Sequence, residues 1–375
     1  MEIKSIQDAD VAGKRVLLRS SLNVPVDSNG KVSDTFRLVR SLPTLEYLAT
    51  RGAKIIVVGY FGRGGETLKP VADALATLVP NIKLTFTTTP IEQVGEEASK
   101  LAAGEVLVLE NIRKHPGEEK NDPALARALA SLADIYIYDA FAEAHRAYAS
   151  NVGVAKLLPS YAGFLMEEEV KRLTPALTPP VGAIAMIGGA KFETKQPLIE
   201  KLLGLYSKVL LGGALGNDVL KARGFPFGDS LISEVAVPES MAANERLEVA
   251  VDVALSGGKM DGRTTIVTDV RADEKIFDIG AQTATAWSKY IIASPFIVWN
   301  GPMGVYEKGF IEGTDTLAKA IASSGAHAII GGGDTAAAIA KFTFEPERVF
   351  VSSGGGAMLQ FLSDGTLPAL EVLKD

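Results

Sequence analysis

The hydrophobic residues of this chain fall into short apolar runs rich in Val, Ile and Leu, each followed by a polar or glycine-rich loop. Between most of these runs, apolar residues recur every three or four positions instead. Continuous apolar runs are typical of strands buried on both faces, and the longer period is typical of amphipathic helices. We predict strands at 15–19, 54–58, 105–109, 134–138, 183–187, 208–211, 264–268, 295–299, 328–330 and 348–351, and helices at, for example, 40–50, 123–132, 196–205 and 313–323.

Strands that alternate with helices predict parallel sheets covered by helices on both faces. The predicted strands form two groups, one on each side of residues 160–180. We therefore expect an α/β protein with two doubly wound, Rossmann-like parallel-sheet domains. Between the groups, residues 165–173 have the pattern of a charged amphipathic helix, and residues 174–180 are a proline-rich loop. Such a segment is a plausible domain connector.

Composition narrows the classes of function. The 375 residues carry a net charge of −7, which argues against general binding to nucleic acid or to acidic membranes. There is no cysteine, so disulfides, thiolate metal sites and a cysteine nucleophile are excluded. The start of the chain lacks the apolar core of a signal peptide, and no run is long enough to span a membrane. We expect a cytoplasmic protein.

A glycine run at residues 331–333 connects a predicted strand to a predicted helix and is followed by Asp334 and Thr335. Backbone N–H groups at a helix start can hold phosphate, and an aspartate beside them suggests a divalent cation. Taken alone, the run is explained equally well as an ordinary strand-to-helix connection with Asp334 as its cap. The spacing also mimics a dinucleotide fingerprint, but the next strand ends in Val351-Ser352 without the required acid. No Gly-Lys-Ser/Thr occurs, which excludes a P-loop.

Ligands bind at the carboxyl ends of strands in open parallel sheets. In the first half of the chain, arginines occur at or after four predicted strand ends, at Arg19, Arg63, Arg113 and Arg146. Four guanidinium groups in one cleft would bind a small molecule with several negative charges. In the second half, the strand ends carry glycines and two lysines instead, which indicates a nucleotide pocket.

Several longer motifs occur together and in one order, at 15–25, 109–119, 139–150, 188–191, 299–305, 331–335 and 353–356. On these residues the chain resembles the phosphoglycerate kinases over essentially its whole length. The resemblance implies reversible phosphoryl transfer between 1,3-bisphosphoglycerate and Mg-ADP, giving 3-phosphoglycerate and ATP. It also implies an acid-substrate domain at 1–160 completed by a tail at 358–375, a hinge at 161–180 and a nucleotide domain at 181–357. We expect Mg²⁺ as the cofactor, small molecules as the partners and a monomer.

The resemblance also assigns roles to residues. Arg37 would lie nearest the transferred group, Lys195 would follow it across, and the amides of Gly333 and Gly355 would face it. Asp334 would hold Mg²⁺. The acid substrate would contact Arg19, Ser21, Asn23, Arg37, Tyr60, Arg63, Arg113 and Arg146. The nucleotide would contact Gly189, Lys191, Lys195, Gly213, Asn300, Pro302, Gly304, Glu307, Gly332, Gly333, Asp334 and Thr335.

The sequence departs from the family pattern mainly among the acid-binding residues. Ser21 stands where the family has Asp, Tyr60 and Tyr148 stand where it has His, and Ala142-Glu143 replaces a Gly-Thr pair. Two alternatives to an ordinary enzyme therefore remain open. One is a paralogue with altered acid specificity or weak activity, and the other is a non-catalytic protein that binds adenine nucleotides.

Overall fold

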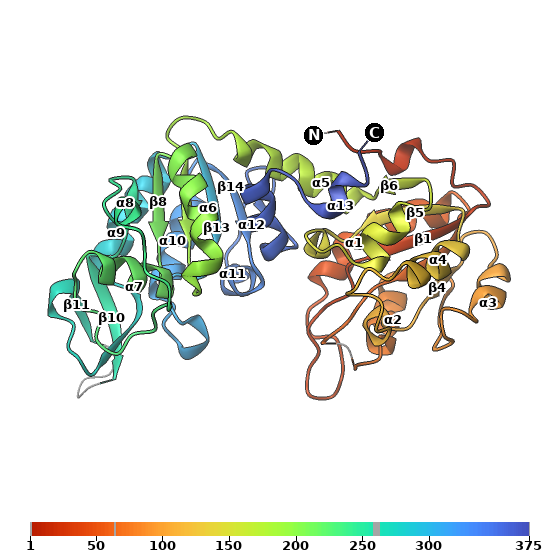
Figure 1. Cartoon of the computed structure of the whole chain (residues 1–375), viewed down its shortest axis with the longest axis horizontal. Coiled ribbons are helices and arrows are strands. Elements are labelled where there is room, and N and C mark those ends of the chain that lie inside the picture. The colour runs from red at the N-terminus through yellow and green to blue at the C-terminus, as the bar shows by residue number, and fades with distance from the viewer. Residues whose placement is uncertain (1, 64, 258–262, 375) are drawn as a thin grey trace. The chain divides into compact units, whose positions relative to one another are not determined.

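The computed structural model describes residues 2–63, 65–257 and 263–374 of the chain. The chain divides into two compact units (Figure 1). Unit 1 consists of Met1–Lys171 together with Thr366–Asp375, and unit 2 is Arg172–Gly365. The sequence thus leaves unit 1 once and returns to it at the C-terminus.

Unit 1 contains a six-stranded sheet in the order β3-β4-β2-β1-β5-β6, and all of its pairings are parallel. Its strands are β1 (Arg15–Ser20), β2 (Lys54–Val58), β3 (Leu84–Phe86), β4 (Val106–Val108), β5 (Ile135–Asp139) and β6 (Ser160–Ala162). Its helices are α1 (Phe36–Thr50), α2 (Lys69–Leu78), α3 (Gly95–Ser99), α4 (Pro123–Ser131) and α13 (Pro368–Glu371), with α5 (Phe164–Leu173) crossing the unit boundary.

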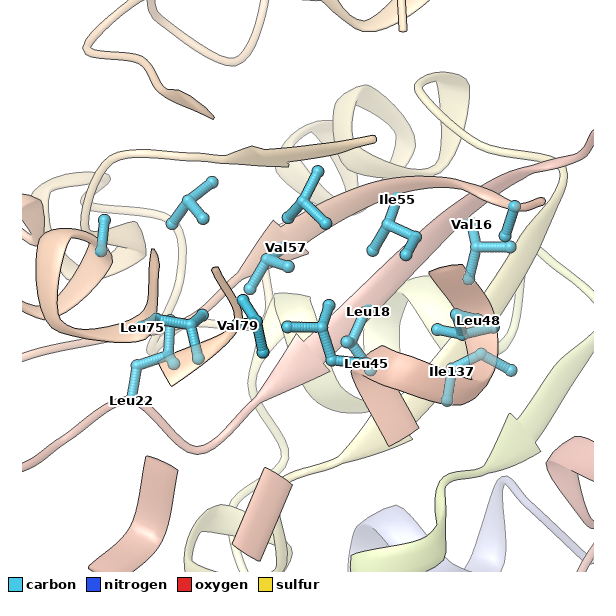
Figure 2. Close-up of a cluster of buried hydrophobic side chains, with 14 of the residues drawn as sticks. Val16, Leu18, Leu22, Leu45, Leu48, Ile55, Val57, Leu75, Val79 and Ile137 are labelled. Atoms are coloured by element: carbon cyan, nitrogen blue, oxygen red, sulfur yellow. The ribbon is translucent and has the colours of Figure 1, made fainter. Parts of the chain in front are cut away.

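The core of unit 1 explains why its strands are continuous apolar runs. Figure 2 shows side chains from β1 and β2 packed with Leu45 and Leu48 of α1. Val16 and Ile55 belong to this cluster, whereas Leu17 points to the opposite face of the sheet and is equally buried. Because both faces are covered, every position of the strand has to be apolar.

Unit 2 contains a second parallel six-stranded sheet, in the order β15-β14-β13-β7-β8-β9. Its strands are β7 (Ile184–Ile187), β8 (Lys208–Leu211), β9 (Leu247–Glu248), β13 (Phe296–Asn300), β14 (His327–Gly331) and β15 (Val349–Val351). Its helices are α6 (Phe192–Leu205), α7 (Gly213–Ala222), α8 (Glu239–Ala242), α9 (Ala281–Ala293), α10 (Glu312–Ser323), α11 (Gly333–Ile339) and α12 (Gly355–Asp364). Two parallel sheets with interleaved helices confirm the predicted α/β class.

One predicted strand was assigned to the wrong kind of sheet. The run at 264–268 was expected in a parallel sheet, but β11 (Thr264–Ile266) pairs antiparallel with β10 (Asp252–Gly257). With β12 (Glu274–Ile279) these strands form a separate antiparallel sheet in the order β11-β10-β12. An apolar or β-branched run indicates a strand, but it does not identify the partner that fixes the direction of pairing.

The predicted amphipathic helix at 165–173 is confirmed as α5, and the proline-rich segment after it begins with a 3₁₀ helix at Thr174–Leu177. The buried carboxylate of Asp139 holds the start of α5. Its Oδ1 accepts the backbone N–H groups of Leu165 at 3.0 Å and Met166 at 3.3 Å. Asp139 is the last residue of β5, so this contact ties the sheet of unit 1 to the helix that leaves the unit.

The C-terminal segment returns to unit 1, where it contacts the N-terminal residues and the segment after β5 (Figure 1). Lys4 N–H donates to the carbonyl of Leu373 at 3.0 Å, and Ala369 N–H donates to the carbonyl of Ala144 at 3.1 Å. Leu370 and Leu373 are fully buried.

Among the helices of the described residues, none is both long enough and apolar enough to cross a membrane.

Candidate functional site

Each parallel sheet has one point at which the strand order reverses direction, and ligands of such folds bind there. In unit 1 the reversal lies between β1 and β5, and in unit 2 it lies between β7 and β13. The predicted acid-binding residues cluster around the first point, and the predicted nucleotide-binding residues cluster around the second.

In unit 1, Tyr60 is the centre of the polar cluster. It follows β2, and its hydroxyl accepts a hydrogen bond from Asn23 Nδ2 at 3.2 Å. Asn23 Oδ1 accepts the N–H of Gly62 at 3.0 Å, while the carbonyl of Asn23 accepts from Arg37 Nη1 at 2.7 Å. These bonds join the loops after β1 and β2 to the first turn of α1, so Asn23, Arg37 and Tyr60 form one connected group.

Arg113 stacks on this group. Its guanidinium carbon lies 3.7 Å from the centroid of the Tyr60 ring, and its Nη1 donates to the carbonyl of Gly62 at 3.0 Å. Burial raises the pKa of Tyr60 and Glu143 reinforces the rise, while Arg113, Arg19 and Arg37 oppose it. The phenol is therefore protonated at neutral pH and provides an O–H donor among cations.

Two predicted arginines of this group are exposed. Arg146 Nη1 donates to the hydroxyl of Tyr148 at 2.7 Å. Burial alone would lower the pKa of Arg146, but Tyr148 and the nearby Tyr60 raise it above its usual value. For Arg63, the described residues offer no hydrogen bond or ion pair to the guanidinium, which remains at the surface after β2. Both side chains can reach a ligand without breaking a buried contact.

Arg19 and Ser21 lie deeper than the sequence suggested. Arg19 is fully buried on β1, where its Nε donates to Ser150 Oγ at 3.1 Å and its Nη1 to the carbonyl of Ser20 at 2.7 Å. Ser21 is also fully buried. A strand-end arginine looks the same in sequence whether it faces solvent or the interior, because only the packing of residues such as Ser150 decides its orientation.

Two buried acids near Arg19, Glu118 and Glu143, are not among the predicted site residues. Glu118 Oε1 accepts from Ser150 Oγ at 2.5 Å, and burial raises the pKa of Glu118. Glu143 lies with Oε2 at 3.7 Å from Arg19 Nη1, and both side chains are almost completely buried. The only sequence signal for Glu143 was its departure from the family pattern.

In unit 2, glycines let backbone segments approach one another at the strand ends. A Cβ on Gly188 would lie 2.0 Å from the carbonyl oxygen of Pro302, so the loops after β7 and β13 touch through their backbones. A Cβ on Gly213 would lie 2.8 Å from the carbonyl oxygen of Gly189. Gly189 itself has φ +99° and faces open space. It is therefore a position where a ligand can contact bare backbone.

The loops that begin α11 and α12 also meet at this point. A Cβ on Gly355 would lie 2.3 Å from the Cα of Gly332, and the Nδ2 of Asn300 would lie 3.3 Å from that Cβ. Thr335 is fully buried, and its Oγ1 accepts the N–H of Gly301 at 2.8 Å, so its side chain braces the neighbouring loop. Gly333, in contrast, opens to empty space.

The charged residues of this site differ in exposure. Lys191 is exposed and has φ +67° at the N-cap of α6, a strained conformation that is concentrated at functional sites. Lys195, one turn later, is partly buried, and this burial lowers its pKa. Asp334 is exposed in the first turn of α11, and Glu307 is exposed on a 3₁₀ helix at Tyr306–Lys308. Pro302 is half-buried and Gly304 is buried.

Comparison with known proteins identifies the family of these two sites. The model of one protein family, phosphoglycerate kinase, matches residues 6–365. The chain belongs to the phosphoglycerate kinase family. Phosphoglycerate kinase of Rubrobacter xylanophilus is 41% identical over 392 residues, covering 100% of this chain and 99% of the relative. That of Thermus thermophilus is 40% identical over 400 residues, covering 99% and 100%.

Solved structures of the same family have the same fold. Phosphoglycerate kinase from Coxiella burnetii has a TM-score of 0.83 at 35% identity, with 99% of each chain covered. The enzyme from Pyrococcus horikoshii has a TM-score of 0.86 at 30% identity, with 99% of this chain and 98% of that chain covered. The resemblance seen in the sequence is thereby confirmed, and the chain is a phosphotransferase of the kinase type.

Proposed function

We propose that this kinase transfers a phosphoryl group reversibly between 1,3-bisphosphoglycerate and ADP, giving 3-phosphoglycerate and ATP in glycolysis. The observation that carries the proposal is the complementary chemistry of the two sites. One strand reversal is lined by arginines around Tyr60 and suits a small acid with phosphate and carboxylate groups. The other is lined by glycines and lysines and suits a nucleotide.

The assignment of roles follows the two units. The acid binds in unit 1, within the proposed domain 1–160 completed by the tail 358–375, and the nucleotide binds in the proposed domain 181–357. The proposed hinge, 161–180, contains the boundary between Lys171 and Arg172 that separates the compact units. Placing the substrates on different units gives the protein a means of assembling the reactive arrangement only when both are bound.

In the direction of ATP formation, a β-phosphate oxygen of ADP attacks the acyl phosphate of 1,3-bisphosphoglycerate. The new P–O bond forms as the bond between phosphorus and the carboxyl oxygen breaks, and 3-phosphoglycerate leaves as a carboxylate. No covalent intermediate with the protein is needed. The chain contributes positive charge from Arg37 and Lys195 and backbone donors at Gly333 and Gly355, which stabilise the charge on the transferred group.

The residues present fit Mg²⁺ bound together with the nucleotide. Asp334 is exposed beside the glycine loop, and the described residues contain no cluster of three or more His, Cys, Asp or Glu that could hold a metal by itself. One protein carboxylate plus phosphate oxygens and waters is a common Mg²⁺ environment. When bound, the ion would neutralise phosphate charge.

We also propose that the protein acts as a cytoplasmic monomer, since each unit carries a site on its own strand ends. Light scattering on the purified protein tests its mass.

A coupled assay with 3-phosphoglycerate and Mg-ATP tests the function. We expect saturable turnover with 3-phosphoglycerate and none with glycerate, which lacks the phosphate that the arginines bind. If Mg-ATP binds but no acid is phosphorylated, the kinase proposal is wrong and a non-catalytic nucleotide-binding protein is indicated. If a different phosphorylated acid is turned over at least ten times more efficiently, the paralogue with altered specificity is indicated.

A further inference from the structure

A group of buried polar atoms without hydrogen-bond partners lies at the strand reversal of unit 1. Within the described residues, neither Oε1 nor Oε2 of Glu143 has a partner, and the same is true of Arg19 Nη2 and Ser21 Oγ. The side chain of Glu143 is only 1% exposed. Buried polar atoms are normally paired, so several unpaired atoms in one place require an explanation.

These residues occupy adjacent strand ends. Ser20, the last residue of β1, pairs in register with Asp139, the last residue of β5. Ser21 follows the first of these residues directly, and Glu143 ends a 3₁₀ helix at Phe141–Glu143 that follows the second. Arg19 and Glu143 are 3.7 Å apart, which is close enough for a strong charge interaction in the interior but too far for a direct hydrogen bond.

Tyr60 lies next to this pair and links it to the acid site. The guanidinium carbon of Arg19 is 5.8 Å from the centroid of the Tyr60 ring, and that of Arg113 is 3.7 Å from it. In addition to burial, Glu143 raises the pKa of Tyr60, and Arg113, Arg19 and Arg37 oppose this rise. Against the lowering effect of burial, Glu143 and Glu118 both raise the pKa of Arg19.

We propose that Glu143 is a positioning residue for the acid substrate, whose buried carboxylate fixes Arg19 and thereby the Tyr60 ring on which Arg113 stacks. A departure in sequence supports this role. The resemblance to the phosphoglycerate kinases implies Asp at position 21 and Thr at position 143, whereas this chain has Ser21 and Glu143. The chain therefore keeps a carboxylate beside Arg19 but supplies it from the segment after β5 instead of the segment after β1. The inference rests on the proposed function.

Glu143→Gln tests the charge with almost no change in shape. We expect the KM for 3-phosphoglycerate to rise about tenfold, with kcat and the KM for ATP changing less than about twofold, because the nucleotide site is in the other unit. A purely structural role would lower the melting temperature without this split between the two KM values. Glu46→Gln, which changes an exposed carboxylate on α1, is the matched control and should change none of these values.

The sharper test moves the carboxylate from position 143 to position 21. Glu143→Thr alone should raise the KM for 3-phosphoglycerate at least as much as Glu143→Gln, and Ser21→Asp added to Glu143→Thr should restore it to within about threefold of wild type. If the double variant is no better than Glu143→Thr, or if neither single variant changes this KM, the inference is wrong. If Glu143→Thr alone does not fold, the KM of the folded double variant for 3-phosphoglycerate is compared directly with that of the wild-type protein.

Calorimetric titration of 3-phosphoglycerate into the wild-type protein separates the two proposals. Wild-type protein that neither binds nor phosphorylates this acid contradicts the proposed function. Wild-type protein that does both, with variants that bind the acid equally well, contradicts only the role of Glu143.

Discussion

At the scale of single residues, the two sites differ in how they hold positive charge. Arg37 and Arg113 are fixed by hydrogen bonds to backbone carbonyls in unit 1. Lys195 in unit 2 has no hydrogen bond or ion pair within the described part of the chain, although burial lowers its pKa. A partly desolvated ammonium without a protein partner is available to a phosphoryl group, and its interaction strengthens as negative charge moves toward it.

We therefore expect Lys195→Ala to lower kcat by about 100-fold or more while the Kd for Mg-ATP changes less than about threefold. The reason is that the ammonium acts on the group in transfer more than on the bound nucleotide. Steady-state kinetics and calorimetry measure the two quantities. Lys289→Ala, which removes an exposed lysine from α9, is the control. Equal losses in kcat and affinity would show that Lys195 is only a binding residue.

At the scale of elements, the beginnings of α11 and α12 are in contact through glycine. A Cβ added to Gly355 would lie 2.3 Å from the Cα of Gly332. A Cβ added to Gly333 would have no atom within 4 Å. The two glycines thus have different physical requirements. Gly355 is needed for the fold itself, and Gly333 is free to vary in the structure described.

Gly333→Ala should leave the melting temperature unchanged or raise it slightly, because alanine favours a helical first turn by up to about 1 kcal/mol. It should nevertheless lower kcat, since a methyl group would enter open space that the proposed function assigns to the transferred group. Gly355→Ala should destabilise unit 2 by about 1–3 kcal/mol through overpacking. Thermal unfolding and kinetics of both variants check this; an unimpaired kcat in Gly333→Ala would remove its amide from the proposed site.

The start of α5 depends on a carboxylate whose titration has a clear consequence. Burial raises the pKa of Asp139 to about 7, against the opposing effect of its hydrogen bonds. The folded protein therefore holds this proton across a pH range in which the unfolded chain has lost it. Because the folded pKa lies above the unfolded one, this group makes stability fall as the pH rises from about 4 to about 7, with no further effect above that.

Asp139→Asn should abolish this dependence while keeping an oxygen that can accept from Leu165. The stability of the variant relative to wild type should increase by up to about 1.4 kcal/mol per pH unit between pH 4 and 7 and then become constant. Urea unfolding monitored at several pH values measures the difference. Parallel curves for the two proteins over this range would mean that Asp139 does not titrate there.

At the scale of the whole molecule, unit 1 is built from both ends of the chain. Leu373 is fully buried, and its carbonyl accepts from Lys4 at 3.0 Å, so the last residues are part of the folded unit and not an appendage. The stability of unit 1 consequently depends on a segment that follows the complete sequence of unit 2.

Leu373→Ala should destabilise unit 1 by about 2–5 kcal/mol, the usual cost of truncating a buried leucine, and should leave the unfolding of unit 2 unchanged. Calorimetry should therefore show one transition moving to lower temperature while the other stays. Leu157→Ala, at a leucine of the same unit that is 49% exposed, should have little effect. A single transition that shifts as a whole would show that the units unfold as one.

Much of the fold was predictable because burial on both faces forces strands such as β2 to be continuous apolar runs, and α5 has a clear helical period. The short strands β3 and β6 were missed because they contain polar residues and incompletely buried positions, whereas β4, of the same length, is apolar and fully buried. β10 and β12 were also missed, since an antiparallel sheet outside the main alternation leaves no distinct signal. The glycines and arginines at the strand ends were predictable because parallel strands all end at one edge.

The sequence by itself determined the α/β class, the family and the residue types at the two strand reversals, since these follow from local pattern and from motif order. Only the tertiary structure decided that Arg19 points inward and that Thr335 braces Gly301. It also decided that the Glu143 carboxylate is buried beside Arg19, with no hydrogen-bond partner among the described residues. The physical reason is that burial and pairing are properties of segments far apart in the chain. Position 143 lies more than 100 residues from position 19, and packing alone brings them together.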